Sequence, residues 1–343
     1  MPSESKREKV PSKVANGRYE IVKKLGAGCF GDVYLGRSTE EQKEVAIKFE
    51  DASGRALQLE HEVSVLRRLG NPTLPQGIAE VFFFAREGHH NCMVVELLGR
   101  SLEDRVQTCK GKYNAKTATL VAQQVLTRVQ YLHSKGIVHR DIKPENFMFG
   151  HQRNKCHHIY VIDFGLSKRY FDEKHVQMRK NLSLTGTARY ASINAHLGVE
   201  QSRRDDLEAV GHMFLYFLRG SVPWSGLEAK TQEEKYNKIR EKKEHTDLKE
   251  LCKGYPEAFE TYLRYCRALQ FSQRPDYNML KALFADLRTQ SGWTEDHAFQ
   301  WYEGKDLGPL IAVDLADSPQ PDDAKVAPRS NFCFCGSASK VKD

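Results

Sequence analysis

The chain has 343 residues, of which 40% are hydrophobic and 28% are charged, and its net charge at pH 7 is +7. This length and composition predict a soluble globular protein with one large domain or two lobes, and they exclude a small disulfide-stapled module. The eight cysteines are scattered, and the longest apolar run, residues 81–85, is too short to span a membrane. We therefore expect a reducing, cytoplasmic or nuclear setting.

Residues 1–17 are polar and charged, and they predict a mobile tail. From residue 18 the pattern changes to short apolar alternation broken by glycines, which predicts a strand, a glycine turn and a second strand. Glycines let a backbone lie close over phosphates and point N–H groups at them. A dinucleotide-binding glycine motif would continue into a helix, but residues 33–35 read as extended, which favours a nucleotide-clamping hairpin.

The next predicted strand, residues 45–49, encloses Lys48 between apolar neighbours. Burying a charged lysine there costs free energy unless anions compensate for the lost hydration, and nucleotide phosphates would supply such anions. Residues 56–69 then predict a helix with apolar side chains along one face. Glu62 can reach back from this helix to Lys48. Glu60 is the competing candidate, but it is two residues away and therefore lies on another face.

Two further strands, at residues 82–84 and 93–98, would close a small antiparallel sheet. The three consecutive phenylalanines at 82–84 are interpreted as core. A short link then joins this sheet to a mostly helical remainder. The backbone of Glu96 and Leu98 is therefore predicted to contact an adenine edge, with Val95 as the small residue behind it.

A helix over residues 117–133 leads into the octapeptide His-Arg-Asp-Ile-Lys-Pro-Glu-Asn at 139–146. Asp141 can accept the proton that leaves an attacking hydroxyl, Lys143 can neutralise charge on a transferring phosphoryl group, and Asn146 can offer an oxygen to a metal ion. Taken alone, the octapeptide is also compatible with a charged surface loop.

An apolar strand over residues 159–163 ends in Asp163. The interval from Asn146 allows a short hairpin that brings the two side chains together as oxygen ligands for Mg²⁺. The glycine loop, Lys48, the octapeptide with Asp141, and Asp163 now agree in order and spacing. Together they predict phosphoryl transfer from a nucleotide to a hydroxyl.

These motifs resemble those of the eukaryotic protein kinases, and the segments after Gly165 are similar to the casein kinase 1 family. Residues 184–194 carry Ser-Ile-Asn where most kinases close the activation segment with Ala-Pro-Glu. The resemblance covers residues 18–302. Further family-like blocks are residues 96–104, 200–208 and 251–256.

The resemblance implies an α+β fold with two lobes. The N-lobe, residues 18–96, would be a small, mostly antiparallel β domain with one main helix. A hinge at residues 96–99 would lead to a larger helical C-lobe, residues 100–305. Residues 306–343 would form a C-terminal tail.

The resemblance also implies Ser/Thr kinase activity with ATP and Mg²⁺ as cofactors, and it places Asp206 where kinases use an aspartate to brace the catalytic loop. The implied catalytic residues are Lys48, Glu62, Asp141, Lys143 and Asn146, and the implied metal ligands are Asn146 and Asp163. The implied ATP-binding residues are Leu25, Gly26, Ala27, Gly28, Cys29, Phe30, Gly31, Val33, Ala46, Lys48, Val95, Glu96 and Leu98.

Casein kinase 1 enzymes prefer acceptors preceded by an acidic or already phosphorylated (primed) residue. The corresponding anion pocket is Arg189, the Gly226 backbone and Lys235, whose charges suit a phosphate dianion better than a single carboxylate. The local field is less positive than in close relatives, which often carry lysine or arginine at the positions of Leu182, Glu228, Gln232 and Glu233. We therefore expect a weaker preference for primed substrates.

Family members are generally active without activation-loop phosphorylation. We expect the same here, although Arg140 offers an anion contact. Arg274 resembles an arginine that many kinases pair with the glutamate of Ala-Pro-Glu, and Glu200 is its candidate partner. Cys29 stands at the glycine-loop tip, where serine or asparagine is usual. It is either a neutral substitution or a thiol sensitive to oxidants and electrophiles.

The tail changes character twice. Residues 306–323 hold five aspartates and a short apolar piece at 310–313 that could pack on the domain. Residues 324–343 are basic around Cys333 and Cys335, each flanked by phenylalanine. S-acylation of both cysteines would associate the chain with a membrane surface, and the alternative is a disordered tail with unmodified thiols.

Two other functions compete with this interpretation. A kinase-fold scaffold with little catalysis would predict the loss of Lys48, Asp141 or Asp163, and none is lost. The hypothesis of a nucleic-acid-binding protein rests only on the net positive charge, because the sequence lacks a binding motif that combines aromatic and basic residues. We expect a monomeric kinase that acts on acidic or primed protein substrates, with no nucleic acid as its primary partner.

Overall fold

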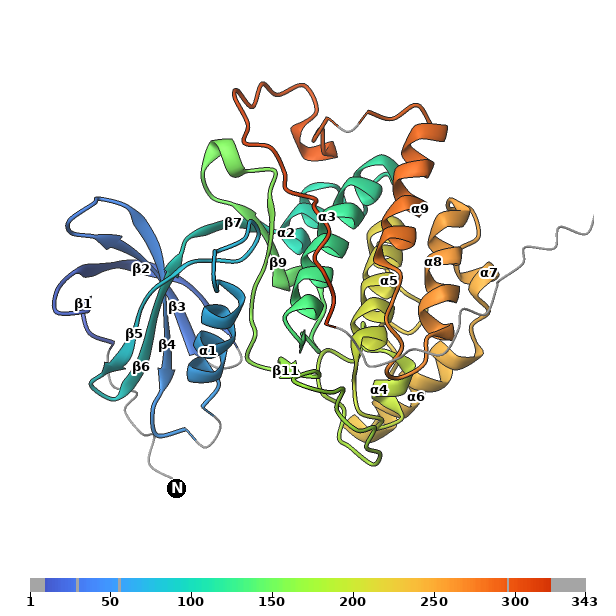
Figure 1. Cartoon of the computed structure of the whole chain (residues 1–343), viewed down its shortest axis with the longest axis horizontal. Coiled ribbons are helices and arrows are strands. Elements are labelled where there is room, and N and C mark those ends of the chain that lie inside the picture. Colours follow the sequence, from blue (N-terminus) through green and yellow to red (C-terminus); the bar gives the residue numbers. More distant parts are fainter. Residues whose placement is uncertain (1–9, 29–30, 55–56, 295, 322–343) are drawn as a thin grey trace, which may run out of the picture.

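The computed structural model describes residues 10–28, 31–54, 57–294 and 296–321. Figure 1 shows a small β-rich lobe with one main helix beside a larger, mostly helical lobe. The described elements confirm the α+β, two-lobed prediction.

The small lobe is built on an antiparallel sheet with the strand order β1-β2-β3-β4-β6-β5. Its strands are β1 Lys13–Val14, β2 Tyr19–Gly28, β3 Gly31–Ser38, β4 Glu44–Asp51, β5 Val81–Glu87 and β6 His90–Glu96. Side chains alternate along a strand, so Val45, Ile47 and Phe49 of β4 are buried in the core of the sheet. Ala46 and Lys48 therefore lie on the opposite face.

Strand β1 shows that the prediction of a mobile tail over residues 1–17 is wrong for its described part. Lys13 and Val14 pair with β2, and Val14 is 1% exposed in the core of the sheet. Residues 15–17 then adopt left-handed backbone conformations that turn the chain back into β2. The few apolar residues of this segment show no alternation over several positions, so sequence analysis missed the strand.

Helix α1, Leu59–Leu69, packs against β5 and β6. Its buried side chains follow the helical period, and Glu62 is among them, whereas Glu60 is exposed. The phenylalanines at 82–84 are partly buried and pack against two buried clusters, so they line the core as interpreted and are not fully enclosed in it.

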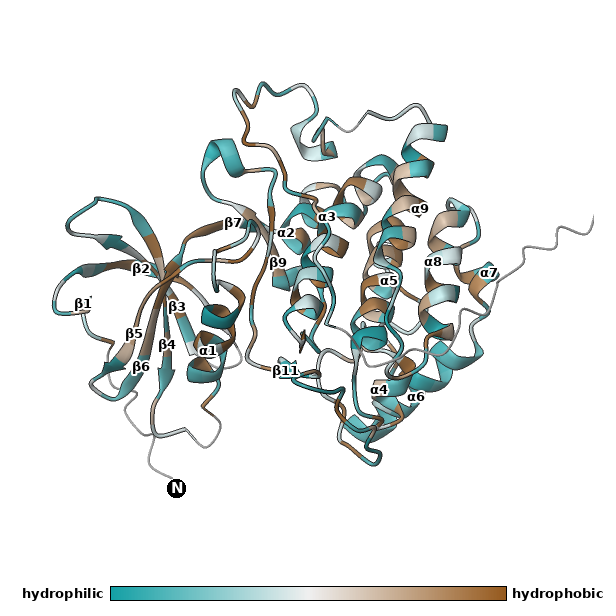
Figure 2. Ribbon diagram, viewed as in Figure 1, coloured by the Kyte–Doolittle hydropathy of each residue, from teal (hydrophilic) through white to brown (hydrophobic). Residues whose placement is uncertain are grey.

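The large lobe is centred on two helices, α3 and α5, which pack against each other and against α9 and α8. Figure 2 shows apolar residues along α3 and α5, whereas α6 is mostly hydrophilic. None of the helices in the described ranges is long and apolar enough to cross a membrane. In chain order the elements are β7 Leu98–Ser101, α2 Leu102–Thr108, α3 Ala115–Ser134, β8 Ile137–Val138, β9 Phe147–Gly150, β10 Ile159–Val161, β11 Lys168–Arg169, α4 Ile193–His196, α5 Arg203–Arg219, α6 Gln232–His245, α7 Leu248–Leu251, α8 Glu257–Ala268 and α9 Tyr277–Gln290, with short 3-10 turns at Pro144–Asn146, Arg153–Lys155 and Gln300–Tyr302.

The last described segment, residues 306–321, lies along the large lobe and is called the C-terminal strap (red in Figure 1). The Ile311 carbonyl accepts hydrogen bonds from the ring nitrogens of His157 and His158, at 2.8 and 2.7 Å. The Ile311 side chain itself is 42% exposed. The expected contact of residues 310–313 is therefore present, but peptide groups make it rather than buried apolar side chains.

Gln76 and Arg128 extend this docking. The Gln76 side-chain amide donates to the Ala312 carbonyl at 3.0 Å and accepts the Asp314 N–H at 2.7 Å. Arg128 of α3 donates to the Asp314 carbonyl at 2.9 Å, and burial lowers its pKa to about 10. Because the strap supplies an acceptor to a buried guanidinium, it belongs to the folded domain beyond the predicted boundary at residue 305. The two cysteines considered for acylation, Cys333 and Cys335, lie outside the described residues.

Candidate active site

The octapeptide at residues 139–146 is braced by Asp206 of α5. The Asp206 carboxylate accepts hydrogen bonds from the backbone N–H groups of His139 and Arg140 at 2.7 and 2.9 Å. It also accepts a hydrogen bond from Nε2 of His133 at 2.9 Å. Burial disfavours the charged carboxylate, but these hydrogen bonds, that of His133 foremost, outweigh burial and hold the pKa of Asp206 below its usual value. Asp206 therefore fixes the loop backbone, as expected from the resemblance.

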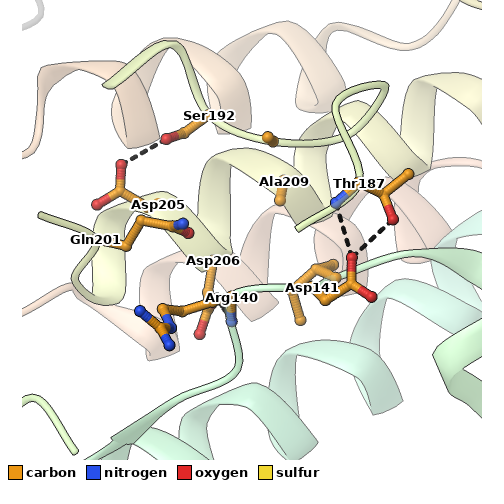
Figure 3. A pocket seen from close by; sticks show the side chains of 10 residues that line it. Arg140, Asp141, Thr187, Ser192, Gln201, Asp205, Asp206 and Ala209 are labelled. Atoms are coloured by element: carbon orange, nitrogen blue, oxygen red, sulfur yellow. Dashed lines mark hydrogen bonds between the residues drawn. The ribbon is translucent and has the colours of Figure 1, made fainter. Parts of the chain in front are cut away.

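The two carboxylate oxygens of Asp141 accept hydrogen bonds from different groups, and Figure 3 shows those from Thr187. Its Oδ2 accepts from Lys143 Nζ at 2.7 Å, while Oδ1 accepts the N–H and the hydroxyl of Thr187 at 2.8 and 2.7 Å. Burial raises the pKa of Asp141, but the hydrogen bonds from Lys143 and Thr187 outweigh burial and hold it below its ordinary value. The carboxylate is thus charged and oriented, as a proton acceptor must be.

Thr187 is a partner of Asp141 that sequence analysis missed. It lies 46 residues beyond Asp141, in the activation segment, residues 165–194. The cavity beside the pair has a volume of about 10 Å³, so it has room for no more than about one water molecule. Asp141 is therefore held by protein groups on both sides.

Lys143→Met is expected to raise the pKa of Asp141, because the Lys143 hydrogen bond is the largest of the effects that favour the carboxylate. Asp141 accepts a proton only when it is deprotonated, so the acid limb of the kcat/KM profile should move to higher pH. The measurement is the initial rate of phosphoryl transfer against pH. Lys249→Met, at an exposed position of α7, is the matched control. An acid limb that stays in place would show that Lys143 does not set the charge of Asp141.

Asn146 and Asp163 are brought together by the antiparallel hairpin of β9 and β10. The N–H of Ile162 donates to the Asn146 carbonyl at 3.0 Å, and Asp163 follows directly. The side-chain amide nitrogen of Asn146 donates to the Asp141 carbonyl at 2.9 Å, which leaves its Oδ1 for a cation. A carboxylate and an amide oxygen suit Mg²⁺. The described ranges hold no group of three or more His, Cys, Asp or Glu side chains fit to bind a metal, so other oxygens would have to complete the coordination.

Lys48 forms an ion pair with Glu62 at 2.5 Å, and Glu60 is therefore not its partner. Burial disfavours the charged amine. The carboxylates of Glu62 and Asp163 outweigh burial and raise the pKa of Lys48, which stays protonated. A cation held in this way lies within electrostatic reach of the carboxylate predicted to bind the metal.

The described ATP-binding residues that were predicted fall on strands of the small-lobe sheet and on β7, which follows it in the chain. Leu25, Gly26, Ala27 and Gly28 lie in β2, Gly31 and Val33 in β3, Ala46 and Lys48 in β4, Val95 and Glu96 in β6, and Leu98 in β7. The strand register sets Val33 opposite Lys48 and Ala46 opposite Val95. The structure therefore gathers these residues from segments more than 60 positions apart in the chain.

The glycine loop leaves bare backbone next to these residues. At Gly26 an added Cβ would meet nothing within 4 Å, whereas at Gly31 it would lie 1.8 Å from the Phe49 carbonyl oxygen. Gly31 is thus required for packing on β4, and Gly26 exposes backbone that a phosphate can approach. Cys29 and Phe30 lie outside the described residues, so their predicted roles and the reactivity of Cys29 stay predictions.

The predicted anion pocket draws on segments that pack together. Trp224 Nε1 donates to the Arg189 carbonyl at 2.7 Å, which sets the turn containing Gly226 beside Arg189. The side chains of Arg189 and Lys235 are exposed, so their charges are available to a ligand.

Lys243 of α6 holds the same segment from another side. Its Nζ donates to the carbonyls of Ala188 and Ala191, which flank Arg189, at 2.8 and 2.5 Å. Burial lowers the pKa of Lys243. Lys235 lies two turns earlier on α6. The hydrogen bonds of Lys243 therefore connect the helix that carries Lys235 to the segment that carries Arg189. Sequence analysis missed Lys243, although its spacing of four residues from the other buried side chain of α6 marks it as inward-facing.

Glu200 does not take its predicted partner. Its carboxylate pairs with Lys168 and Arg179, whereas Arg274 is exposed. The suggested pairing of Glu200 with Arg274 is therefore wrong. The physical reason is that two cations of the activation segment lie closer and satisfy both carboxylate oxygens.

A family model described as protein kinase domain matches residues 19–283, most of the chain. The chain belongs to the protein kinase family. The kinase therefore uses ATP and a divalent metal, and its residues fit both groups. Gly26 and the protonated Lys48 offer backbone and charge to phosphates, while Asn146 and Asp163 offer oxygens to a cation. The match runs from β2 into α9, so β1 and the C-terminal strap lie outside it.

Proposed function

We propose that the kinase is a Ser/Thr protein kinase of casein kinase 1 type, which transfers the γ-phosphoryl group of ATP to serine or threonine hydroxyls of proteins. The observation that carries the proposal is the charged Asp141 carboxylate, held between Lys143 and Thr187 and linked to Asn146. A kinase-fold scaffold would not need a proton acceptor oriented in this way. The choice of casein kinase 1 type rests on the sequence blocks that resemble that family.

Each side chain has a separate task in this proposal. Asp141 accepts the proton of the attacking hydroxyl, and Lys143 offsets the charge that builds on the transferring group. Lys48, held by Glu62, orients the phosphates. Mg²⁺, when bound, neutralises phosphate charge. We also infer that activity needs no phosphate on the activation segment, because Thr187 of that segment already contacts Asp141.

Acidic or primed substrates are supported by the exposed cations of the anion pocket. Arg189 and Lys235 can donate to a phosphate, and the open backbone at Gly226 adds space, since an added Cβ there would meet nothing within 4 Å. Glu228 and Glu233 lower the positive field around the pocket. We therefore propose recognition of primed substrates with a modest advantage over unprimed ones.

The test is steady-state phosphoryl transfer to three matched peptides, with serine, with serine preceded by phosphoserine, and with tyrosine at the acceptor position. We expect transfer to both serine peptides, a primed advantage of no more than about tenfold, equal to ~1.4 kcal/mol, and none to tyrosine. Arg189→Gln should abolish the primed advantage, and Lys253→Gln, an exposed lysine elsewhere, should keep it.

Three outcomes would contradict parts of the proposal. A primed advantage far above tenfold would contradict the modest preference. Transfer to tyrosine would contradict the Ser/Thr assignment. Absence of transfer from protein shown to bind ATP would favour the scaffold.

A further inference from the structure

Glu200 is a buried carboxylate at the centre of a charge cluster outside the catalytic centre. The residue is 1% exposed, and its carboxylate oxygens accept from Lys168 Nζ and Arg179 Nε, both at 2.7 Å. Burial lowers the pKa of Arg140, and the charge of Glu200 is the largest of the effects that oppose this. Two cations of the activation segment therefore pair with one carboxylate, and Arg140 of the catalytic loop lies within its electrostatic reach.

Glu200 and Gln201 also hold the backbone of the activation segment. The Glu200 backbone N–H donates to the Arg179 carbonyl at 2.8 Å, and the Gln201 side-chain amide donates to the Thr185 carbonyl at 3.0 Å. Two residues beyond Thr185, Thr187 makes the two hydrogen bonds to Asp141. A continuous set of contacts thus runs from Glu200 along the activation segment to the catalytic carboxylate.

The carboxylate of Glu200 is charged in the folded protein. Burial alone would raise its pKa, but the hydrogen bonds from Lys168 and Arg179 outweigh burial and hold the pKa below its ordinary value. A side-chain carboxylate carries less charge than a phosphate, but low solvent exposure strengthens its attraction to the cations around it.

In kinases that are switched on by phosphorylation, a phosphate on the activation segment orders that segment by pairing with arginines. We propose that Glu200 is a positioning residue that supplies this negative charge permanently and so keeps the activation segment ordered against the catalytic loop. This inference rests on the proposed activity without activation-segment phosphorylation and gives that activity a physical cause. Glu200 touches neither the acceptor nor the nucleotide, so it acts through Thr187 and Asp141.

The test compares full-length wild-type and Glu200→Gln protein, both treated with a phosphatase, in transfer to the serine peptide. Glutamine keeps the size of the side chain and removes its charge. We expect kcat to fall by roughly 5- to 150-fold, the usual range for loss of coupling between two sites, with little change in the KM for ATP. Glu250→Gln, an exposed glutamate that pairs with Lys253, is the control and should behave as wild type.

Two further variants separate positioning from a purely structural role. In Glu200→Ala, added sulfate should restore part of kcat, whereas sodium chloride at equal ionic strength should not, because only a compact dianion can replace the lost charge among the cations. Arg179→Met changes a side chain that is 60% exposed, so it should fold even if the Glu200 variants do not, and it should lower kcat in the same direction.

The outcomes distinguish this inference from the proposed function. An inactive phosphatase-treated wild type would overturn both. An active wild type with an equally active Glu200→Gln, or with a fully active Arg179→Met, would overturn the inference alone. The same holds if Glu200→Ala loses activity and sulfate restores none of it.

Discussion

Asp141→Asn is expected to lower kcat for transfer to the serine peptide by about 10²–10⁴-fold, the usual contribution of a general base. The amide keeps the shape of the side chain but cannot accept the hydroxyl proton, and it ends the ion pair with Lys143. The affinity for ATP should change little, since the backbone of the loop is held by Asp206 and not by the Asp141 side chain. The measurement is initial rate at saturating ATP, with nucleotide binding measured separately.

Asp286→Asn is the matched control, because Asp286 is an exposed aspartate of α9. It should keep the wild-type rate. If Asp141→Asn retained most of the wild-type kcat while Asp286→Asn did the same, Asp141 would not be the proton acceptor. If the wild type itself bound ATP without transferring phosphate, the chain would be a scaffold and the comparison would show no difference.

Lys48→Met has the second largest expected effect, a fall in kcat/KM of about 10²–10³-fold, which is typical for removing one preorganised charge at a developing negative centre. Methionine keeps the apolar stem and removes the ammonium group. The same change leaves Glu62, a carboxylate with 7% exposed side chain, without its cation. Since both residues act through one contact, Lys48→Met with Glu62→Gln should be no slower than Lys48→Met alone.

Steady-state kinetics of the two single variants and the double variant would provide this comparison. Lys23→Met supplies the control, because Lys23 is an exposed lysine of β2, a strand of the same sheet. Additive losses in the double variant would contradict the idea that Glu62 works by holding Lys48.

The parts of the site that follow local periodicity were predictable from the sequence. Helical spacing separated Glu62 from Glu60, and the length of the interval between Asn146 and Asp163 indicated the hairpin that joins them. Extended residues after the glycine turn indicated a β-hairpin rather than a dinucleotide-binding helix. In each case the signal lies within one element or between two consecutive elements, so neighbouring residues were enough to predict it.

The parts that were missed depend on contacts between distant segments without such a pattern. Val14 pairs with β2 from a segment too short to show alternation, and the helical spacing of Lys243 from Ile239 is hidden in a run of charged residues, 240–244. Three cations, Lys168, Arg179 and Arg274, were possible partners of Glu200, and their charges alone do not predict which of them forms the ion pair. The C-terminal strap is held by its peptide groups, which every sequence provides equally.

The strap also has a consequence for the order in which the protein can be completed. Arg128 and Gln76 are synthesised long before residues 312 and 314, which supply their partners. A nascent chain that has just exposed α3 therefore carries Arg128 without its acceptor at residue 314, and that hydrogen bond can form only after the strap has left the ribosome. If translation stopped before the strap, the chain would contain every catalytic residue. It would still expose to chaperones and proteases the Gln76 and Arg128 groups that the strap normally binds.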